Sequence, residues 1–423
     1  METTDTEEVL PLTAINKEAR LVAEADALHA QAASLNQAGR FDEAKETYEK
    51  YAEALGRAEQ ASCNEDYKTA SLRLWSSVGS VVRAVPAAFD LRRRAVAAIL
   101  GAAVADAAAM PVHWVYDMGK LAELLSTPTD AAFYPVPQNA FYRYQFGRSS
   151  PYGEQTEALL DSLLEMGGWS PEAYAARNFD NFAAPSHAAS GGYLDGSTKG
   201  FIRNVRRGVA FPHTGCEDAQ ANAISRLPPL VALLAGDDRM LPCVADMIAV
   251  TQAGDLARSH GLAAARVLEA CIVGRAATPA EAVEAARLQL LDPARHFPQA
   301  DDAAVAESFA KVLSMHDVPH AEAVPALGRN CHLPGNLLST LHALVAYGSY
   351  SEAVQNTIAQ GGCNASRTSL IGACFAACDA QADDEQACAY VPAGWRDKFG
   401  RYRETFERAQ KLAGLRSVCP NHE

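Results

Sequence analysis

The sequence predicts an almost wholly α-helical protein, and three observations support this class. Hydrophobic residues make up 49% of the 423 residues, which is enough to build a large buried core. Alanine is abundant, whereas runs of β-branched residues are scarce. Apolar residues recur at intervals of three and four along most of the chain, which is the spacing of one face of an α-helix.

Residues 1–88 are predicted to form an N-terminal helical hairpin and a linker. One apolar stripe runs from Leu21 to Leu35 and a second from Phe41 to Leu55, with the turn AGRF between them. The stretch LNQAGRFDEAKETYEKYAEAL resembles a single tetratricopeptide unit. Because one such unit cannot bury its own apolar face, we expect the hairpin either to pack on the rest of the chain or to dock a protein partner.

Residues 89–423 are predicted to form one all-helical domain. It begins with the apolar helix FDLRRRAVAAILGAAVADAAAMPVHW, and two turn-rich loops follow, YPVPQNAFYRYQFGRSSPYGEQ and NFAAPSHAASGGYLDGSTKGF. Long loops in a helical protein usually carry a functional site, because the rigid scaffold positions them. From AISRLPPLVALLAG onward the pattern is one helix after another, and Gly361 and Gly362 end one of them.

The charge and the cysteines argue against several classes of partner and location. The formal net charge is −14, and nucleic acids and anionic membranes bind basic faces, so neither is expected as a partner. No apolar run approaches the roughly 20 residues that a membrane-spanning helix needs. The acidic N-terminus lacks the pattern of a signal peptide. The 10 cysteines include no C-x-x-C pair. We therefore expect a soluble, intracellular and cytoplasmic protein.

Three segments of the predicted domain occur in a recognisable order. They are ILGAAVADAAAMPVHW, YGEQTEALLDSLLE and SEAVQNTIAQGGCNASRTSLIGACFAA. Together they resemble the ADP-ribosylglycohydrolase superfamily, and most closely its J-crystallin-like branch, from Phe89 to Trp395. The resemblance implies a large orthogonal helical bundle with a long cleft. It also implies hydrolysis of a ribose glycosidic bond in a small anionic or ADP-ribose-like ligand.

The resemblance further implies two magnesium ions at the floor of the cleft, and such ions need several carboxylates. The family's Thr-Asp-Asp-Thr stretch falls on residues 153–156, and its Gly-Gly-Asp-x-Asp-Thr turn falls on residues 361–366. At the positions of the four expected aspartates the sequence has Glu154, Gln155, Cys363 and Ala365. A dinuclear magnesium centre is therefore not expected. A single weakly held ion would use Glu154 and Ser366.

The altered turn offers a different chemistry, and its interpretation stays open. Cys363 is predicted at the start of a helix, where the helix dipole favours a thiolate. With Glu154 it is the candidate catalytic pair of a metal-independent reaction. The alternative is that Cys363 fills space in a retired site. Arg367 could hold an anion at the helix N-terminus or form a salt bridge with Glu154 or Asp106.

Further candidate ligand-binding residues lie on the same three segments, on the second loop and on the stretch that matches the family's ribose-binding loop. Asp106 lies in an apolar helix, where a buried carboxylate needs a partner, so it either binds ligand or ties the helix to a loop. The full set of candidates for ligand binding is Asp106, Tyr152, Gln155, Thr156, Tyr193, Asn222, Asn364, Ser366 and Arg367.

Three functions remain open from the sequence. The first is a hydrolase of the ADP-ribosylglycohydrolase type. The second is a non-catalytic family member that acts as a ligand-binding, structural or complex subunit, because a fold does not carry a function without its site. The third is a metal-independent enzyme that uses Cys363 and Glu154.

Overall fold

The structure is a computed structural model that describes residues 88–125, 131–380 and 390–416, together with seven residues nearer the N-terminus. The chain divides into two compact units, Met1–Ala87 and Ala88–Glu423. The described part of the chain contains helices and no strand, apart from two isolated bridges that pair Cys216 with Gln252 and Gln220 with His332. The predicted all-α class is therefore confirmed for the described residues.

The seven described residues of the first unit are all helical. They are Glu24, Leu28, Gln31, Glu43, Glu46, Thr47 and Lys50. Within this set Lys50 pairs with Glu46 one turn earlier at 2.7 Å, and the Thr47 hydroxyl donates to the Glu43 carbonyl. The rest of the hairpin predicted over residues 21–55, and its linker, lie outside the described residues.

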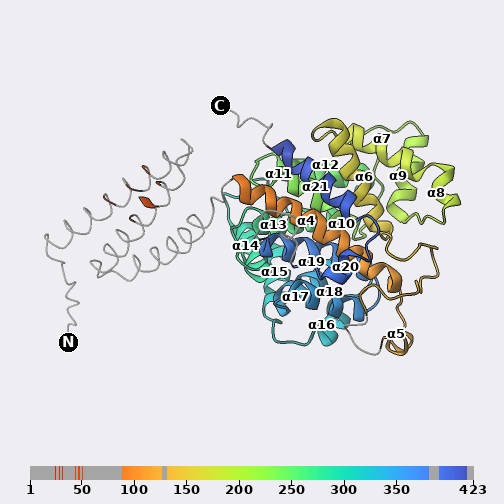
Figure 1. Cartoon of the computed structure of the whole chain (residues 1–423). Helices are drawn as coiled ribbons and strands as arrows, with labels where there is room; N and C mark the ends of the chain where they lie inside the picture. The colour runs from red at the N-terminus through yellow and green to blue at the C-terminus, as the bar shows by residue number, and fades with distance from the viewer. Residues whose placement is uncertain are drawn as a thin grey trace, which may run out of the picture. The chain divides into compact units, whose positions relative to one another are not determined.

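The second unit is a bundle of helices of very different lengths (Figure 1). The helices are α4 (Ala88–Ala109), η1 (Met110–Val112), α5 (Met118–Leu124), α6 (Pro151–Met166), α7 (Pro171–Phe182), α8 (Pro185–Ala189), α9 (Gly196–Arg206), α10 (Asn222–Ser225), α11 (Leu227–Leu234), α12 (Met240–Thr251), α13 (Asp255–Ile272), α14 (Pro279–Leu291), α15 (Asp302–Leu313), α16 (His320–Leu327), α17 (Gly335–Ala346), α18 (Tyr350–Ala359), α19 (Asn364–Asp379), α20 (Ala393–Arg396) and α21 (Tyr402–Leu415).

The centre of the bundle is the packed pair α4 and α19, which run side by side in Figure 1. Small residues let the two backbones approach closely. A Cβ atom added to Gly372 of α19 would lie 2.6 Å from the Cβ of Ala105 on α4. A Cβ atom added to Gly101 of α4 would lie 2.5 Å from the carbonyl oxygen of Gly372. Glycine is therefore required at both positions.

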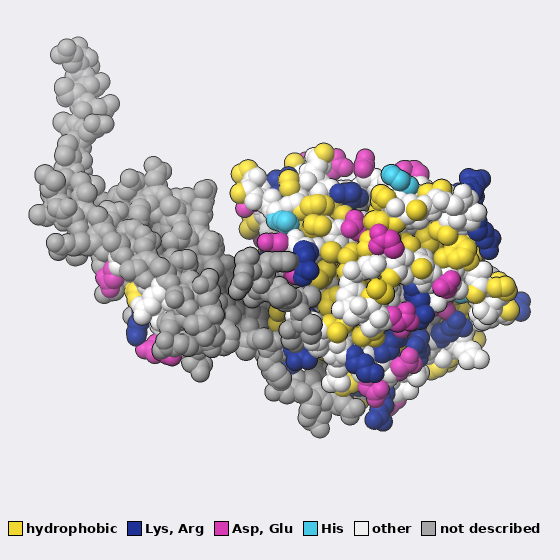
Figure 2. All heavy atoms as spheres, turned by 90° about the horizontal axis from the view of Figure 1, so that it is seen from above, with side chains coloured by type: hydrophobic (Ala, Val, Ile, Leu, Met, Phe, Trp, Pro, Cys, Tyr) yellow, Lys and Arg dark blue, Asp and Glu magenta, His cyan; other side chains and the backbone are white. Residues whose placement is uncertain are grey.

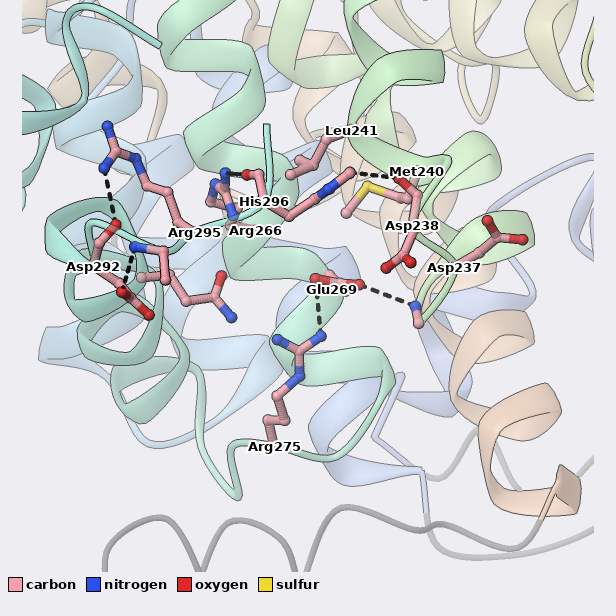
Figure 3. A pocket seen from close by; sticks show the side chains of 13 residues that line it. Asp237, Asp238, Met240, Leu241, Arg266, Glu269, Arg275, Asp292, Arg295 and His296 are labelled. Carbon is pink, nitrogen blue, oxygen red and sulfur yellow. Dashed lines mark hydrogen bonds and ion pairs between the residues drawn. The ribbon is translucent and has the colours of Figure 1, made fainter. Parts of the chain in front are cut away.

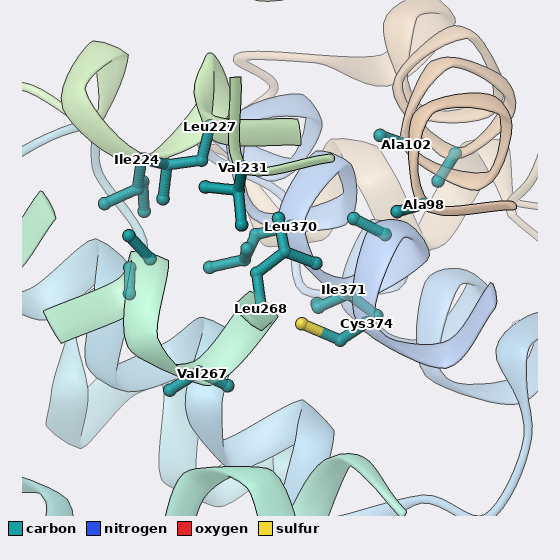
Figure 4. Close-up of a cluster of buried hydrophobic side chains, with 14 of the residues drawn as sticks. Ala98, Ala102, Ile224, Leu227, Val231, Val267, Leu268, Leu370, Ile371 and Cys374 are labelled. Carbon is teal, nitrogen blue, oxygen red and sulfur yellow. The ribbon is translucent and has the colours of Figure 1, made fainter. Parts of the chain in front are cut away.

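Other helices close the core around this pair. Figure 4 shows side chains from α4, α10, α11, α13 and α19 meeting in one apolar cluster. The labelled residues are Ala98, Ala102, Ile224, Leu227, Val231, Val267, Leu268, Leu370, Ile371 and Cys374. Because Cys374 is fully buried among apolar residues, it packs as a small hydrophobic side chain.

One described helix segment, Leu91–Val112, has the length and apolar composition that would allow it to cross a membrane, and 89% of its most apolar window is buried inside the protein. The expectation that no apolar run approaches the length of a membrane span is therefore wrong for this segment, which is the central helix α4 together with the short turn η1 that follows it. The segment is apolar on several sides because it is buried on several sides. Basic and acidic side chains are interspersed on the face of the second unit seen in Figure 2.

Candidate functional site

The first sequence-predicted cluster lies in the first turn of α6, which is well defined by its cap. Ser150 is the N-cap, its hydroxyl accepts from the backbone N–H of Tyr152, and Pro151 occupies the first helical position. The carboxylate of Asp106, on α4, accepts from both the backbone N–H of Ser150 at 2.7 Å and its hydroxyl at 2.5 Å. Asp106 thus ties α4 to the start of α6, as one of the two sequence readings proposed.

Burial controls the charge of Asp106. Desolvation raises the pKa of this carboxyl from its ordinary value of 3.8 to about 7, although the two hydrogen bonds from Ser150 oppose the shift. The native state therefore favours the protonated acid. Between the two pKa values the native state holds a proton that the unfolded chain has released, so the stability that depends on Asp106 falls as the pH rises from about 4 to 7.

We predict that an Asp106→Asn variant will gain stability relative to wild type across this pH range, because asparagine stays neutral. Each pKa unit corresponds to about 1.4 kcal/mol, so the relative gain should be on the order of 2–4 kcal/mol. The measurement is urea unfolding at pH 4, 5, 6, 7 and 8. The exposed Asp180→Asn variant is the control and should parallel wild type. Parallel curves for Asp106→Asn and wild type would refute the assignment.

The contacts of the Glu154 side chain are with the loop that precedes α6, and not with the turn at residues 361–366. Its carboxylate forms an ion pair with Arg148 at 2.5 Å and accepts a hydrogen bond from the hydroxyl of Tyr144. It lines a pocket of about 470 Å³ together with other acidic residues, among them Glu157 and Asp161. Cys363 is not among the residues that line this pocket.

Gln155 and Asn222 meet in a buried polar network around Asp195, the N-cap residue of α9. The Gln155 amide donates to the Asp195 carboxylate at 2.6 Å, and the Asn222 amide donates to the same carboxylate at 3.0 Å and to the Gln155 oxygen at 2.9 Å. Thr156 donates to the carbonyls of Tyr152 and Ser225. The candidate residues of α6 thus point in at least two directions.

The second sequence-predicted cluster lies on the turn before α19. Gly361 and Gly362 both have positive φ, at 63° and 64°, a region that glycine enters without a steric penalty. The turn is held on one side by Val115, whose carbonyl accepts from the Gly362 N–H at 2.8 Å. It is held on the other side by Arg329, whose carbonyl accepts from the Cys363 N–H at 2.8 Å.

Cys363 lies at the N-cap of α19 and is fully buried. Its sulfur is 3.3 Å from the hydroxyl of Tyr152 and 3.1 Å from that of Ser366. Burial by itself raises the pKa of the Cys363 thiol. The side chains of Cys331, His113 and Ser366 outweigh burial and bring the pKa of the thiol well below its ordinary value.

His113 lies beside this turn and is fully buried. It follows η1, and its Nδ1 atom accepts from the backbone N–H of Ala365 at 3.1 Å. This contact leaves the proton of a neutral ring on Nε2. Nε2 is buried and has no hydrogen-bond partner of standard geometry among the described residues. The turn before α19 is therefore lined by thiol, imidazole and hydroxyl groups.

Ser366 and Arg367 complete this turn. The Ser366 hydroxyl is 3.1 Å from the side-chain amide nitrogen of Asn336, which lies in the first turn of α17. The Arg367 guanidinium is fully buried, and it donates to the carbonyls of Arg329 at 2.9 Å and Gly361 at 2.6 Å. Arg367 therefore binds backbone carbonyls, whereas the sequence offered a bound anion or a salt bridge with Glu154 or Asp106.

Aromatic side chains pack beside the two clusters. Tyr193 lies 4.7 Å from Trp114 between ring centroids, and Tyr142 lies 4.5 Å from Tyr144. Tyr142 and Tyr144 are both buried, and with Met110 they form a separate small apolar cluster. The candidate residue Tyr193 thus packs against this group of aromatic side chains.

The predicted site residues fall into separate contact groups in the structure. Cys363, Ser366 and Tyr152 form one contact group, and Gln155 and Asn222 form another. The Asn364 side chain is 3.1 Å from the His113 ring. The sequence reading missed the roles of His113, Asp195, Cys331 and Asn336. Asp195 has a local signal as the N-cap of α9, but the site contacts of all four residues involve partners far away in the sequence.

The residues at this site do not fit a pair of magnesium ions. Magnesium prefers carboxylate and water oxygens, whereas the turn provides Cys363 and Ala365. The described residues contain no group of three or more His, Cys, Asp and Glu side chains that could hold a metal ion. The buried atoms without partners at this site are Nε2 of His113, Oδ1 of Asn222 and Nε of Arg367, none of which belongs to a carboxylate.

Comparisons with known proteins cover the same part of the chain. A family profile described as ADP-ribosylglycohydrolase matches residues 89–421. Crystallin J1A from Tripedalia cystophora is 31% identical over 331 residues, which cover 76% of this chain and 97% of the crystallin. Crystallin J1B from the same organism is 29% identical over 332 residues, with the same coverage.

A solved structure supports the predicted bundle type. It is titled "ADP-ribosylglycohydrolase-related protein complex", and the match has a TM-score of 0.57. The sequences are 19% identical, and the match covers 77% of this chain and 99% of the solved chain. At this identity the likeness shows a shared fold.

Proposed function

Because the chain belongs to the ADP-ribosylglycohydrolase family, we propose that it is a non-catalytic member that uses the family scaffold without magnesium-dependent hydrolysis of a glycosidic bond. The observation that carries the proposal is the buried turn at Cys363 and Ala365, which supplies no carboxylate. Ala365 has no ligand atom, and its backbone N–H is bonded to His113. The relatives named crystallins support a structural role on the same fold.

The remaining polar groups of the site support the proposal because they largely satisfy one another. Glu154 is neutralised by Arg148, so its carboxylate would have to leave an ion pair to bind a metal. Gln155 is held by Asp195 and Asn222 through bonds of 2.6 and 2.9 Å. A polar network with these bonds in place rigidifies a core. Such a network stabilises a scaffold and leaves few groups free to bind and release a substrate.

The test is hydrolysis of a mono-ADP-ribosylated peptide by the full chain in millimolar magnesium, with and without a chelator. We predict no turnover above the rate without protein. We also predict that magnesium will raise the melting temperature no more than potassium chloride at matched ionic strength. An active ADP-ribosylglycohydrolase serves as the positive control for the substrate.

Each alternative gives a distinct result in the same assay. Turnover that disappears with chelator would show the metal-dependent hydrolase and overturn the proposal. Turnover that persists with chelator but disappears in a Cys363→Ser variant would show a metal-independent enzyme and would also overturn it. A Cys243→Ser variant is the matched control for the second result, because the thiol of Cys243 lies outside the site.

A further inference from the structure

A second site lies in a pocket that shares no residue with the cluster at Cys363. The pocket has a volume of about 330 Å³, which is within the range of small-molecule sites. It is formed by α13, the segment before α12 and the segment after α14 (Figure 3). Its charged lining residues are Asp237, Asp238, Arg266, Glu269, Arg275, Asp292 and Arg295, and His296 also lines it.

Arg266 is a buried cation without a counter-ion. It lies on α13 and is only 5% exposed. One terminal nitrogen donates to the His296 carbonyl at 2.6 Å, whereas Nε is buried and has no partner. No carboxylate of the described residues forms an ion pair with it. A buried charge is costly unless it is paired and hydrogen-bonded.

Two carboxylates, those of Glu269 and Asp302, interact electrostatically with Arg266. Both are already paired with other arginines. Glu269 pairs with Arg275 at 3.0 Å, and it also accepts from the Gly236 N–H at 3.0 Å. Asp302, which is buried, pairs with Arg295 at 2.5 Å. Arg266 is therefore left without a carboxylate partner of its own, and an oxyanion would match it with charge-assisted hydrogen bonds.

The outer part of the pocket carries the opposite charge. Asp238 and Asp292 line it and are both exposed. The carboxylate of Asp238 forms no ion pair among the described residues, whereas that of Asp237 pairs with Arg239 at 2.5 Å. In Figure 3, Asp238 and Asp292 lie on opposite sides of the group formed by Arg266 and His296. A ligand that reaches Arg266 therefore passes acidic side chains.

We propose that this pocket binds a small zwitterion. Its oxyanion, a carboxylate or a phosphate, contacts the buried Arg266, and its ammonium group contacts the exposed carboxylate of Asp238. Charge at both ends explains how one pocket contains an unpaired buried cation and an unpaired acid. The proposal does not depend on whether the chain hydrolyses ADP-ribose.

The test is calorimetric titration of the full chain with three probes, namely phosphoethanolamine, inorganic phosphate and ethanolamine. We expect phosphoethanolamine to bind at least tenfold more tightly than either half-molecule. An Arg266→Gln variant should lose at least tenfold in affinity for phosphoethanolamine and for phosphate. An Asp238→Asn variant should bind phosphate as wild type does or more tightly, and should lose part of the advantage of the zwitterion. Glycine, with a carboxylate in place of the phosphate, distinguishes the two kinds of oxyanion.

Arg287→Gln is the matched control, because Arg287 is on the neighbouring helix α14, pairs with Glu284 at 2.6 Å and does not line the pocket. It should bind all probes as wild type does. The absence of binding of phosphoethanolamine and glycine to wild type would overturn the proposal, as would equal binding to Arg266→Gln. If Arg266→Gln fails to fold, unchanged selectivity in Asp238→Asn would overturn it.

Discussion

A Gly372→Leu variant is expected to lose most of the stability of the helical domain. A Cβ atom at this position would lie 2.6 Å from the Cβ of Ala105, and it would also overlap the backbone carbonyl of Gly101. Backbone atoms of α4 cannot move aside as a flexible side chain does, so the central helix pair would have to separate. We expect a cost of about 3 kcal/mol or more in the free energy of unfolding.

The measurement is urea unfolding followed by circular dichroism. Gly394→Leu is the matched control, because a Cβ atom there has no neighbour within 4 Å and the residue is exposed. The control should change the free energy of unfolding by no more than about 0.5 kcal/mol. Equal stability of Gly372→Leu and Gly394→Leu would show that α4 and α19 do not pack as closely as the structure indicates.

An Arg367→Met variant should produce the second large effect, because this guanidinium organises the turn before α19. Arg367 is fully buried and donates to the carbonyls of Arg329 and Gly361. Burial lowers the pKa of Arg367 to about 10, and the negative charge of Cys363 opposes the shift. Methionine would fill much of the volume but would leave the Gly361 carbonyl without this donor. We expect a loss of about 2–4 kcal/mol.

A double-mutant cycle with Cys363→Ser separates the two contributions. If the Cys363 thiolate partly neutralises Arg367, the loss caused by Arg367→Met should be smaller in the Cys363→Ser background. Arg403→Met on α21 is the control, because the Arg403 side chain is 84% exposed. Its effect should stay within about 0.5 kcal/mol. A loss in Arg367→Met no larger than in the control would contradict the structural role assigned to Arg367.

Much of the fold was predictable because it depends on local patterns. The spacing of apolar residues predicts the helix through Leu91–Val112. The double glycine at Gly361 and Gly362 predicts a turn, and both residues do have positive φ. The order of three motifs also predicts the family, which the family profile over residues 89–421 confirms.

The arrangement of side chains at the site was not predictable in the same way. The sequence could show that Cys363 and Ala365 replace acids, but it could not place His113 beside them. His113 and Ala365 are 252 positions apart, and their hydrogen bond exists because α4 and α19 pack together. The same is true of Asp195, whose carboxylate accepts hydrogen bonds from Gln155 and Asn222 on two different helices.

Arg266 also shows the difference between what the sequence predicts and what only the tertiary structure shows. The sequence placed it in a predicted run of helices and gave no reason to single it out. Only the tertiary structure shows that it is buried, that the neighbouring carboxylates are paired elsewhere and that it lines a pocket. The sequence by itself determined the helices, the glycine turn and the loss of acidic ligands, because these depend on residue type and spacing along the chain. Tertiary structure alone decided which charges are paired, because pairing depends on distances between residues that only folding brings together.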